Sequence, residues 1–263
     1  MITIDKNQAD ASDAARPLVL VTGVGRTVGI GAGIARQLAV SGWDIAFTYW
    51  TPYDKRMLWG VEQGATAAID GALADHGAST AAIEADLADP GAPARIFNEA
   101  ERRLGKVTAL VMCHCESVDS GLLDTTLESF DRHFAVNARA TWLLIREYGL
   151  RFRGTNGTGR IVSLTSDHTV GNLPYGASKG ALDRITLAAA QEFAHLGVTA
   201  NVINPGPIDT GWMATEVQES CITQTPLARL GTPQDTAHLV DFLCSRQGQW
   251  INGQLLKSNG GFG

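Results

Sequence analysis

Tyr175 and Lys179 stand four residues apart in PYGASKGALDRITLAAAQEFAHLG (174–197), a stretch with the composition of a helix. Residues at this spacing lie on one face of a helix. An ammonium beside a phenol favours the phenolate, so Lys179 would lower the pKa of Tyr175 from its reference value of about 10. Such a tyrosine can exchange a proton with an alcohol or carbonyl oxygen as hydride moves. The alternative is a surface pair without function.

A second chemical signal is the run TGVGRTVGIGAG, which follows the apolar residues 18–21. A glycine-rich turn between a strand and a helix lets a pyrophosphate approach the unpaired N–H groups at the helix N-terminus. The dinucleotide fingerprint G-x-G-x-x-G would use Gly23 and Gly25, but Val28 stands at its third position. Taken alone, this turn is equally consistent with an ordinary flexible loop.

The elements that must position these residues alternate along the chain. Seven apolar runs predict strands, with helical stretches between them: 18–23, 44–50, 81–86, 108–113, 159–166, 198–206 and 253–261. This order predicts an α/β protein with a single-domain Rossmann fold, a doubly wound seven-stranded parallel sheet with helices on both faces. Residues 123–152 and 174–197 are predicted as two long helices. We expect a tail at residues 1–16 and one dinucleotide-binding and catalytic domain at 17–263.

Two stretches do not fit the alternation: TPYDKRMLWGVEQG (51–64) and TGWMATEVQESCITQTPLARLGTP (210–233). Each begins after a predicted strand, and ligands of open parallel sheets bind at the carboxyl ends of the strands. We therefore expect a substrate wall from residues 51–64 and a lid from residues 210–233.

The composition and charge of the chain limit the kinds of partner that it can be expected to bind. The net charge of -6 argues against binding to nucleic acid or to an anionic membrane. The sequence contains no apolar run near the roughly 20 residues that span a bilayer, and its N-terminus lacks the apolar centre of a signal peptide, which predicts a cytoplasmic protein. The four cysteines are expected to be thiols. Cys113-His114-Cys115 is not expected to bind metal, because in a strand His114 would point away from both cysteines.

Together these segments resemble the short-chain dehydrogenase/reductase family, and among its members the 3-oxoacyl-carrier-protein reductases. The family's glycine motif is Thr-Gly, three residues, Gly, one residue, Gly. This chain has Thr22-Gly23, five residues, and then Gly29-Ile30-Gly31, which is that turn with two additional residues. An alternative register from Gly25 keeps the spacing but loses the threonine. The resemblance covers residues 17–261.

The resemblance implies four catalytic residues. Tyr175 would be the acid/base, and Lys179 would lower its pKa and hold the nicotinamide ribose. Ser166 would hydrogen-bond the substrate oxygen, and Asn137 would support the water that connects Lys179 to solvent. Ser166 and Tyr175 are closer in sequence than the family usually has them, so Thr165 and Ser163 remain weaker candidates for the serine role.

The resemblance also implies a dinucleotide site. Its residues are Thr22, Gly23, Arg26, Gly29, Ile30, Gly31, Asp86, Leu87, Tyr175, Lys179, Pro205, Gly206, Ile208 and Thr210. Asp86 and Leu87 would meet the adenine, and Ile208 and Thr210 the nicotinamide carboxamide. Members of the family that prefer NAD carry an acidic residue at the end of the second strand, and Phe47-Thr48-Tyr49-Trp50 offers none. Arg26 could reach a 2′-phosphate with help from Lys55 or Arg56, so we expect NADP(H) rather than NAD(H).

One departure from the family lies after the fourth predicted strand. Met112-Cys113-His114-Cys115 replaces the family's Asn-Asn-Ala-Gly, so packing beside the adenosine must differ. The acid/base role is already filled by Tyr175, so we expect His114 to be a packing residue.

The predicted function is an NADP(H)-dependent ketoreductase or alcohol dehydrogenase acting on a small molecule. Acidic and histidine side chains at strand ends and on the lid favour a polar hydroxylated or amino-sugar-like ketone: Glu116, Asp167, His168, Glu216 and Glu219. The main rival is a 3-oxoacyl thioester reductase. A hypothesis of another class is a dinucleotide-sensing protein without catalysis. By resemblance we expect a homotetramer or dimer formed through the long helices, which carry Trp142, Leu143 and Leu144.

Overall fold

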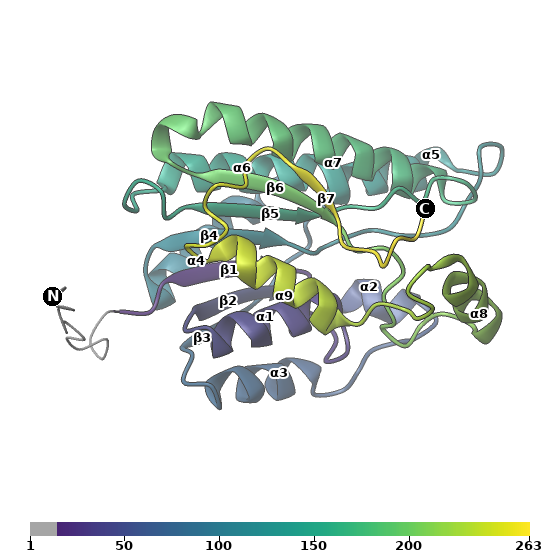
Figure 1. Cartoon of the computed structure of the whole chain (residues 1–263), viewed down its shortest axis with the longest axis horizontal. Coiled ribbons are helices and arrows are strands. Elements are labelled where there is room, and N and C mark those ends of the chain that lie inside the picture. Colours follow the sequence, from purple (N-terminus) through teal and green to yellow (C-terminus); the bar gives the residue numbers. More distant parts are fainter. Residues whose placement is uncertain (1–14) are drawn as a thin grey trace, which may run out of the picture.

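The computed structural model describes residues 15–263, and the remainder of the expected tail lies outside them. Its strands form one parallel sheet in the order β3-β2-β1-β4-β5-β6-β7 (Figure 1). The strands are β1 (Leu18–Thr22), β2 (Asp44–Tyr49), β3 (Thr80–Glu84), β4 (Val107–Met112), β5 (Arg160–Leu164), β6 (Thr199–Asn204) and β7 (Leu255–Lys257). The predicted doubly wound sheet is confirmed. The chain reverses its direction of winding between β1 and β4, and this is where such sheets form their ligand crevice.

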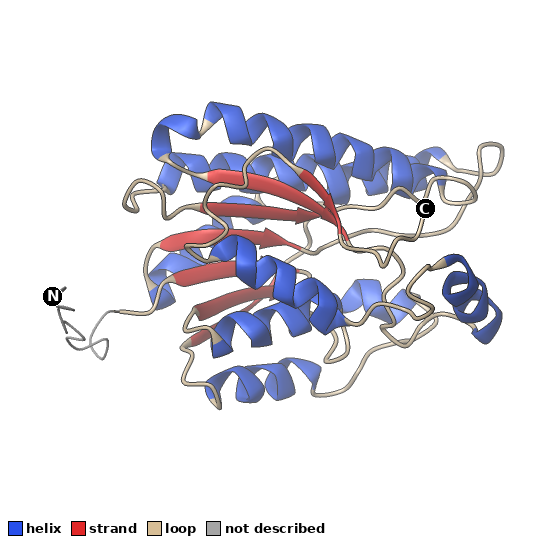
Figure 2. Ribbon diagram, viewed as in Figure 1, coloured by secondary structure: helices blue, strands red, loops and turns tan. Residues whose placement is uncertain are grey.

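Alternate residues of each central strand supply the two cores. Leu18 and Leu20 of β1 belong to one buried cluster, and Val19 and Val21 belong to the other. Because successive side chains of a strand point to opposite faces, an entirely apolar strand needs helices on both sides. Figure 2 shows these helical layers. One cluster includes α4 (Ala92–Leu104), α6 (Ala140–Arg151) and α7 (Leu173–Glu192), and the other includes α1 (Ile30–Val40), α3 (Ala65–Ala74) and α9 (Pro233–Cys244).

The predicted helix at residues 123–152 is interrupted. It divides into α5 (Leu127–His133), a π-helical turn η1 (Phe134–Arg139) and α6. A π-helical turn accommodates an extra residue and commonly marks a functional position. The spacing of apolar residues could not reveal it, because the contacts that select it come from other elements. The second predicted long helix is α7, which is followed by the short 3₁₀ turn η2 (Ala194–Leu196).

The two stretches that broke the alternation lie at the carboxyl edge of the sheet. Residues 51–64 begin with the short helix α2 (Thr51–Arg56), and residues 210–233 contain α8 (Thr215–Gln224). Both helices lie beyond the tips of the strands in Figure 1. Within residues 15–263, none of the helices is long and apolar enough to cross a membrane.

Candidate active site

At two glycines of the turn after β1, Gly23 and Gly31, the neighbouring backbone leaves no room for a side chain. Gly23 has a φ of +76°, and a Cβ there would lie 2.6 Å from the backbone nitrogen of His114. A Cβ on Gly31 would lie 2.7 Å from the Gly23 carbonyl oxygen. The turn leads to Gly29, the N-cap of α1, so backbone N–H groups begin the helix where a pyrophosphate would need them. This geometry fits a dinucleotide.

His114 ties this turn to the neighbouring elements. Its Nε2 lies 3.1 Å from the Val136 carbonyl oxygen, which can only accept a hydrogen bond, so Nε2 carries the proton. Its Nδ1 then accepts from the Thr22 hydroxyl at 2.7 Å. Burial, with help from the charge of Lys179, lowers the pKa of His114 to about 3. The neutral ring therefore acts as a structural bridge, in agreement with the expected packing role.

The expectation that Cys113-His114-Cys115 continues a strand was wrong. β4 ends at Met112, and the three residues form the segment that follows it. Burial raises the pKa of Cys113 to about 12, which favours the thiol. Among the described residues, histidine, cysteine and acidic side chains do not gather in groups of three or more that could hold a metal ion.

Tyr175 and Lys179 occupy successive turns at the start of α7. Lys179 is 2% exposed, and its Nζ donates to the Leu164 carbonyl at 2.8 Å while lying 5.7 Å from the centroid of the Tyr175 ring. Burial lowers the pKa of Lys179. Burial raises the pKa of Tyr175. The Ser166 side chain has a smaller effect in the opposite direction. The expected lowering by Lys179 is not seen, because its ammonium is directed to Leu164 and burial has the larger effect.

The contacts of the three candidate hydroxyl groups reduce the number of candidates for the serine role. Ser163 Oγ pairs with Thr186 Oγ1 at 2.7 Å, and Thr165 Oγ1 reaches the Lys179 carbonyl at 3.4 Å. Both are buried against α7. Ser166, two residues beyond β5, accepts from the His168 N–H at 3.1 Å, and of the three candidates it is the one whose side chain lowers the pKa of Tyr175. The shortened loop after β5 thus still brings this serine to the phenol.

Asn137 lies within the π-helical turn and is completely buried. Its Oδ1 accepts from the Glu116 N–H at 2.7 Å, and its Nδ2 donates to the Glu116 carbonyl and to Ser178 Oγ, each at 2.9 Å. The Ser178 hydroxyl in turn donates to the Tyr175 carbonyl at 2.8 Å. The asparagine therefore fixes the segment after β4 against the start of α7.

The other expected cofactor residues lie along the same edge. Asp86 and Leu87 follow β3, where Asp86 accepts from the Ala88 N–H at 2.9 Å. After β6, Gly206 has a φ of +66° and Ile208 is buried. The residues from this loop are Pro205, Gly206, Ile208 and Thr210. The ends of the strands thus bring together, at one edge of the sheet, the glycine turn, the loops after β3 and β6, and the candidate residues Ser166, Tyr175 and Lys179.

Arg26 is directed across this edge. Its Nη2 donates to the Thr210 carbonyl at 2.8 Å, and its guanidinium carbon lies 4.9 Å from the ring centroid of Trp59. Arg56, an expected helper, forms an ion pair with Glu116 instead. Both guanidinium groups therefore have protein partners in this structure.

Sequence reasoning missed Asp54, which approaches the glycine turn from α2. Its Oδ2 lies 2.9 Å from the position that a Cβ on Gly25 would take. Burial raises the pKa of this carboxyl. The acid stands beyond the end of β2, so a search confined to the strand end could not find it; only the folding back of α2 brings it to the turn.

The expected acidic bias of the substrate site is smaller than the sequence indicated. The Glu116 carboxylate is 3% exposed and paired with Arg56 and Arg132, and Asp167 pairs with Lys257 at 3.4 Å. Ion pairing leaves these two carboxylates less able to attract a cationic substrate.

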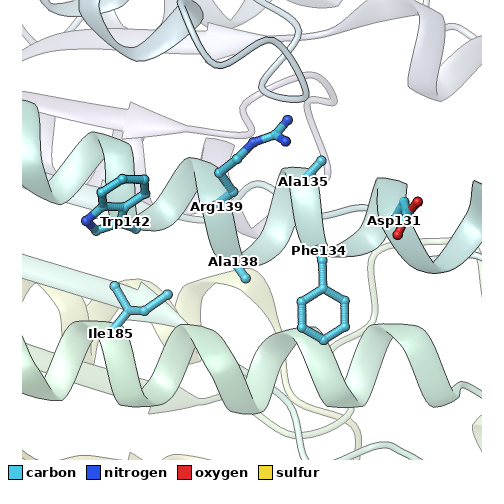
Figure 3. A pocket seen from close by; sticks show the side chains of 7 residues that line it. All are labelled: Asp131, Phe134, Ala135, Ala138, Arg139, Trp142 and Ile185. Atoms are coloured by element: carbon cyan, nitrogen blue, oxygen red, sulfur yellow. The ribbon is translucent and has the colours of Figure 1, made fainter.

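A groove of about 530 Å³ lies away from the strand ends, between α7 and the run from α5 to α6 (Figure 3). It is lined by Asp131, Phe134, Ala135, Ala138, Arg139, Trp142 and Ile185. Trp142 is 51% exposed. The groove belongs to the outer helical face, and its lining does not include Ser166, Tyr175 or Lys179.

Comparison with known proteins identifies the family. The family model described as "Enoyl-(Acyl carrier protein) reductase" matches residues 23–263. The chain is 34% identical over 256 residues to "Uncharacterized oxidoreductase YjdA" from Bacillus subtilis, covering 95% of this chain and 98% of the relative. The chain belongs to the short-chain dehydrogenase/reductase family.

Other members of the short-chain dehydrogenase/reductase family match over nearly the whole chain. The "3-oxoacyl-[acyl-carrier-protein] reductase MabA" of Mycobacterium tuberculosis is 31% identical over 268 residues, with 97% of this chain and 98% of the relative covered. A blue fluorescent protein from a metagenomic library, solved in complex with NADPH, has a TM-score of 0.83 and 32% identity, with 94% of this chain and 97% of that chain covered. This short-chain dehydrogenase/reductase is therefore an oxidoreductase, and the resemblance read from its motifs is confirmed.

The buried His114 predicts a pH dependence of stability. Its pKa is 6.5 in the unfolded reference and about 3 in the fold, so between these values the unfolded chain binds the additional proton. The free energy of unfolding should therefore fall as pH decreases from about 6.5 to 5, by up to about 1.4 kcal/mol per pH unit from this residue. His114→Ala should be less stable at pH 7 by roughly 2 kcal/mol and should lose that slope.

Urea unfolding at several pH values measures both quantities. His76→Ala is the matched control, because His76 is exposed and its replacement should preserve the slope of the unsubstituted protein. If the free energy of unfolding depended equally on pH in the His114→Ala protein and the unsubstituted protein, the role of His114 as a buried hydrogen-bonding bridge would be contradicted.

Proposed function

We propose that this protein reduces a ketone to a secondary alcohol, or catalyses the reverse reaction, by hydride transfer with NADP(H). The observation that carries the proposal is the meeting of Ser166 and Lys179 at Tyr175, beside a glycine turn that fits a dinucleotide. A phenol, a hydroxyl and an ammonium at one point can hold a carbonyl oxygen and deliver a proton to it.

Each residue of the set has a proposed part in the reaction. Bound nicotinamide supplies the hydride. The Tyr175 hydroxyl donates the proton to the carbonyl oxygen, and its raised pKa keeps that proton in place until the oxygen gains charge. The Ser166 hydroxyl, whose side chain acts on the pKa of this phenol, would hold the same oxygen. In the oxidative direction the Tyr175 phenolate would accept the alcohol proton, and Lys179 would stabilise it only after its ammonium turns from the Leu164 carbonyl towards the phenol.

Asn137 and Lys179 have further proposed parts. Asn137 holds Glu116 and Ser178, and through Ser178 the backbone of Tyr175, so it fixes the phenol relative to the glycine turn. We also assign to it the support of a water that links Lys179 to solvent. The Lys179 ammonium would hold the nicotinamide ribose.

NADP(H) is the proposed cofactor. Thr22, Gly23, Gly29, Ile30 and Gly31 would hold the pyrophosphate, Asp86 and Leu87 the adenine, and Pro205, Gly206, Ile208 and Thr210 the nicotinamide. The match to a protein solved with NADPH supports this choice. The carboxyl of Asp54 lies beside the glycine turn, where a negative charge would oppose a 2′-phosphate.

Two substrate classes are proposed. A polar hydroxylated or amino-sugar-like ketone is supported by the exposed Glu216 and Glu219 on α8, and weakened by the ion pairs of Glu116 and Asp167. A 3-oxoacyl thioester is supported by the similarity to MabA along the whole chain. We also propose that the protein acts in the cytoplasm.

Replacing Tyr175 tests the reaction. Following NADPH oxidation with ketones, keto sugars, 3-oxoacyl thioesters and enoyl thioesters should show turnover of a ketone class. Tyr175→Phe should lower kcat/KM for that substrate by roughly 10²- to 10⁴-fold, because the proton donor is lost, while NADPH still binds. Unchanged turnover in the phenylalanine variant would refute the acid/base role, and tight NADPH binding without turnover of any compound would favour the dinucleotide sensor.

A separate prediction concerns the preference of the protein for NADPH over NADH. The kcat/KM with NADPH should exceed that with NADH by at least about tenfold, equivalent to about 1.4 kcal/mol of transition-state binding. Asp54→Asn should enlarge this ratio, because the amide keeps the size of the side chain and removes its negative charge. A ratio at or below one in the unsubstituted protein would reject NADP(H).

We propose a homo-oligomer, a tetramer or dimer, with a second copy packed on the groove between α6 and α7. The family resemblance and the half-exposed Trp142 beside the groove support it. Sedimentation velocity should show a dimer or tetramer, and Trp142→Glu should shift the protein towards monomer. A monomer at micromolar concentration would overturn the proposal.

A further inference from the structure

We propose that residues 51–64 and Arg26 form a clasp across the dinucleotide site, and that breaking this clasp limits how fast the cofactor leaves. The inference rests on the proposed function, because it requires a bound dinucleotide. It follows from contacts that this segment makes with three loops at the carboxyl edge of the sheet, after β1, β4 and β6.

The clasp first contacts the glycine turn after β1. The Glu62 carboxylate accepts hydrogen bonds from the N–H and the hydroxyl of Thr27, the former at 3.0 Å. These bonds lower the pKa of Glu62, so the carboxylate form is favoured. Asp54 meets the same turn at Gly25. The far end of the segment is thus bonded to the loop that would hold the pyrophosphate, and its start lies close to the same loop.

The second attachment is to the segment after β4. Arg56 pairs with the buried carboxylate of Glu116, and its guanidinium carbon lies 5.0 Å from the ring centroid of Tyr53. The Tyr53 hydroxyl is directed at the Ser117 carbonyl at 3.4 Å. Because Asn137 holds both backbone groups of Glu116, this attachment ends on the rigid part of the active site.

The third attachment reaches the loop after β6 through Arg26. Its guanidinium lies over Trp59 and donates to the Thr210 carbonyl. The Trp59 ring is fixed by a bond from Nε1 to Asp54 at 2.9 Å and lies 6.4 Å, centroid to centroid, from Trp212. Arg26 belongs to the glycine turn and Thr210 to the proposed nicotinamide loop, so this contact joins the two ends of the crevice.

A dinucleotide that lies along these loops would be covered by the clasp. Arginine stacked on an aromatic ring and bonded to a carbonyl is held in a defined position. Release then requires Arg26 to leave Thr210 or Trp59 to leave Arg26. This role differs from recognition of a 2′-phosphate, because a clasp retains NADPH and NADH alike, whereas phosphate recognition retains only NADPH.

Cofactor release distinguishes the two roles. Full-length protein loaded with NADPH, and separately with NADH, is mixed rapidly with excess oxidised coenzyme, and the loss of bound nicotinamide fluorescence gives the dissociation rate. Trp59→Leu and Arg26→Gln should each speed release of both coenzymes by roughly tenfold. Trp250→Leu is the matched control, since this tryptophan is exposed, lies outside residues 51–64 and should leave the rate unchanged when replaced.

A second variant keeps the test independent of the aromatic substitution. Glu62→Gln removes the charge that holds Thr27 at an exposed position, and it should also speed the release of both coenzymes. Melting curves check that each variant is folded.

Unchanged rates in folded Trp59→Leu and Glu62→Gln would overturn the clasp. Faster release of NADPH alone, confined to Arg26→Gln, would also overturn it and assign Arg26 to the 2′-phosphate. If the unsubstituted protein bound neither coenzyme, the proposed function itself would fail together with the clasp. Normal binding with unaltered release in the variants would reject the clasp alone.

Discussion

The hydrogen bonds of His114 hold together the parts of the structure on which the site depends. One neutral ring joins Thr22 at the end of β1 to Val136 in the π-helical turn, from a position just after β4. A protonated ring would place a charge in a buried site near Lys179, which is why its pKa lies so far below the ordinary value. The close approach of Gly23 to this histidine follows from the same contact.

Asn137 connects the elements joined by His114 to the start of α7. The π-helical turn is fixed at Val136 by His114, and the adjoining asparagine side chain holds Glu116 on one side and Ser178 on the other. Through Ser178, Asn137 therefore positions the backbone of Tyr175, the proposed proton donor. A buried amide satisfied by three partners is rigid, because breaking any one of its bonds leaves a polar group without water.

The region beyond the strand ends has a different physical character. Residues 51–64 are held by charges, aromatic faces and hydrogen bonds to loops, with little contact to the two cores. Such contacts are individually weak and can be broken without unfolding the sheet. The same protein thus combines the buried Asn137 and Lys179 with a covering segment that, in our proposal, opens for exchange of a cofactor.

The sequence by itself determined the strands, the doubly wound sheet and the family, and it supplied the residues of the proposed catalytic set. These depend on local signals: strands of two-sided apolar character, the glycine turn, and the four-residue spacing of Tyr175 and Lys179 on one helix. Such signals are written within a few residues of each other, so no long-range contact is needed to read them.

Only the tertiary structure decided the π-helical turn at Asn137, the raised pKa of Tyr175, and the partners of Arg26, Asp54 and Glu116. Each depends on groups distant in the sequence: Arg26 meets Thr210, Asp54 meets Gly25, and Arg56 neutralises Glu116. The loops that converge at the edge of the sheet determine where the Arg26 side chain is directed and how far the Tyr175 phenol is buried. That convergence is a property of the packed fold, and residue type and spacing do not contain it.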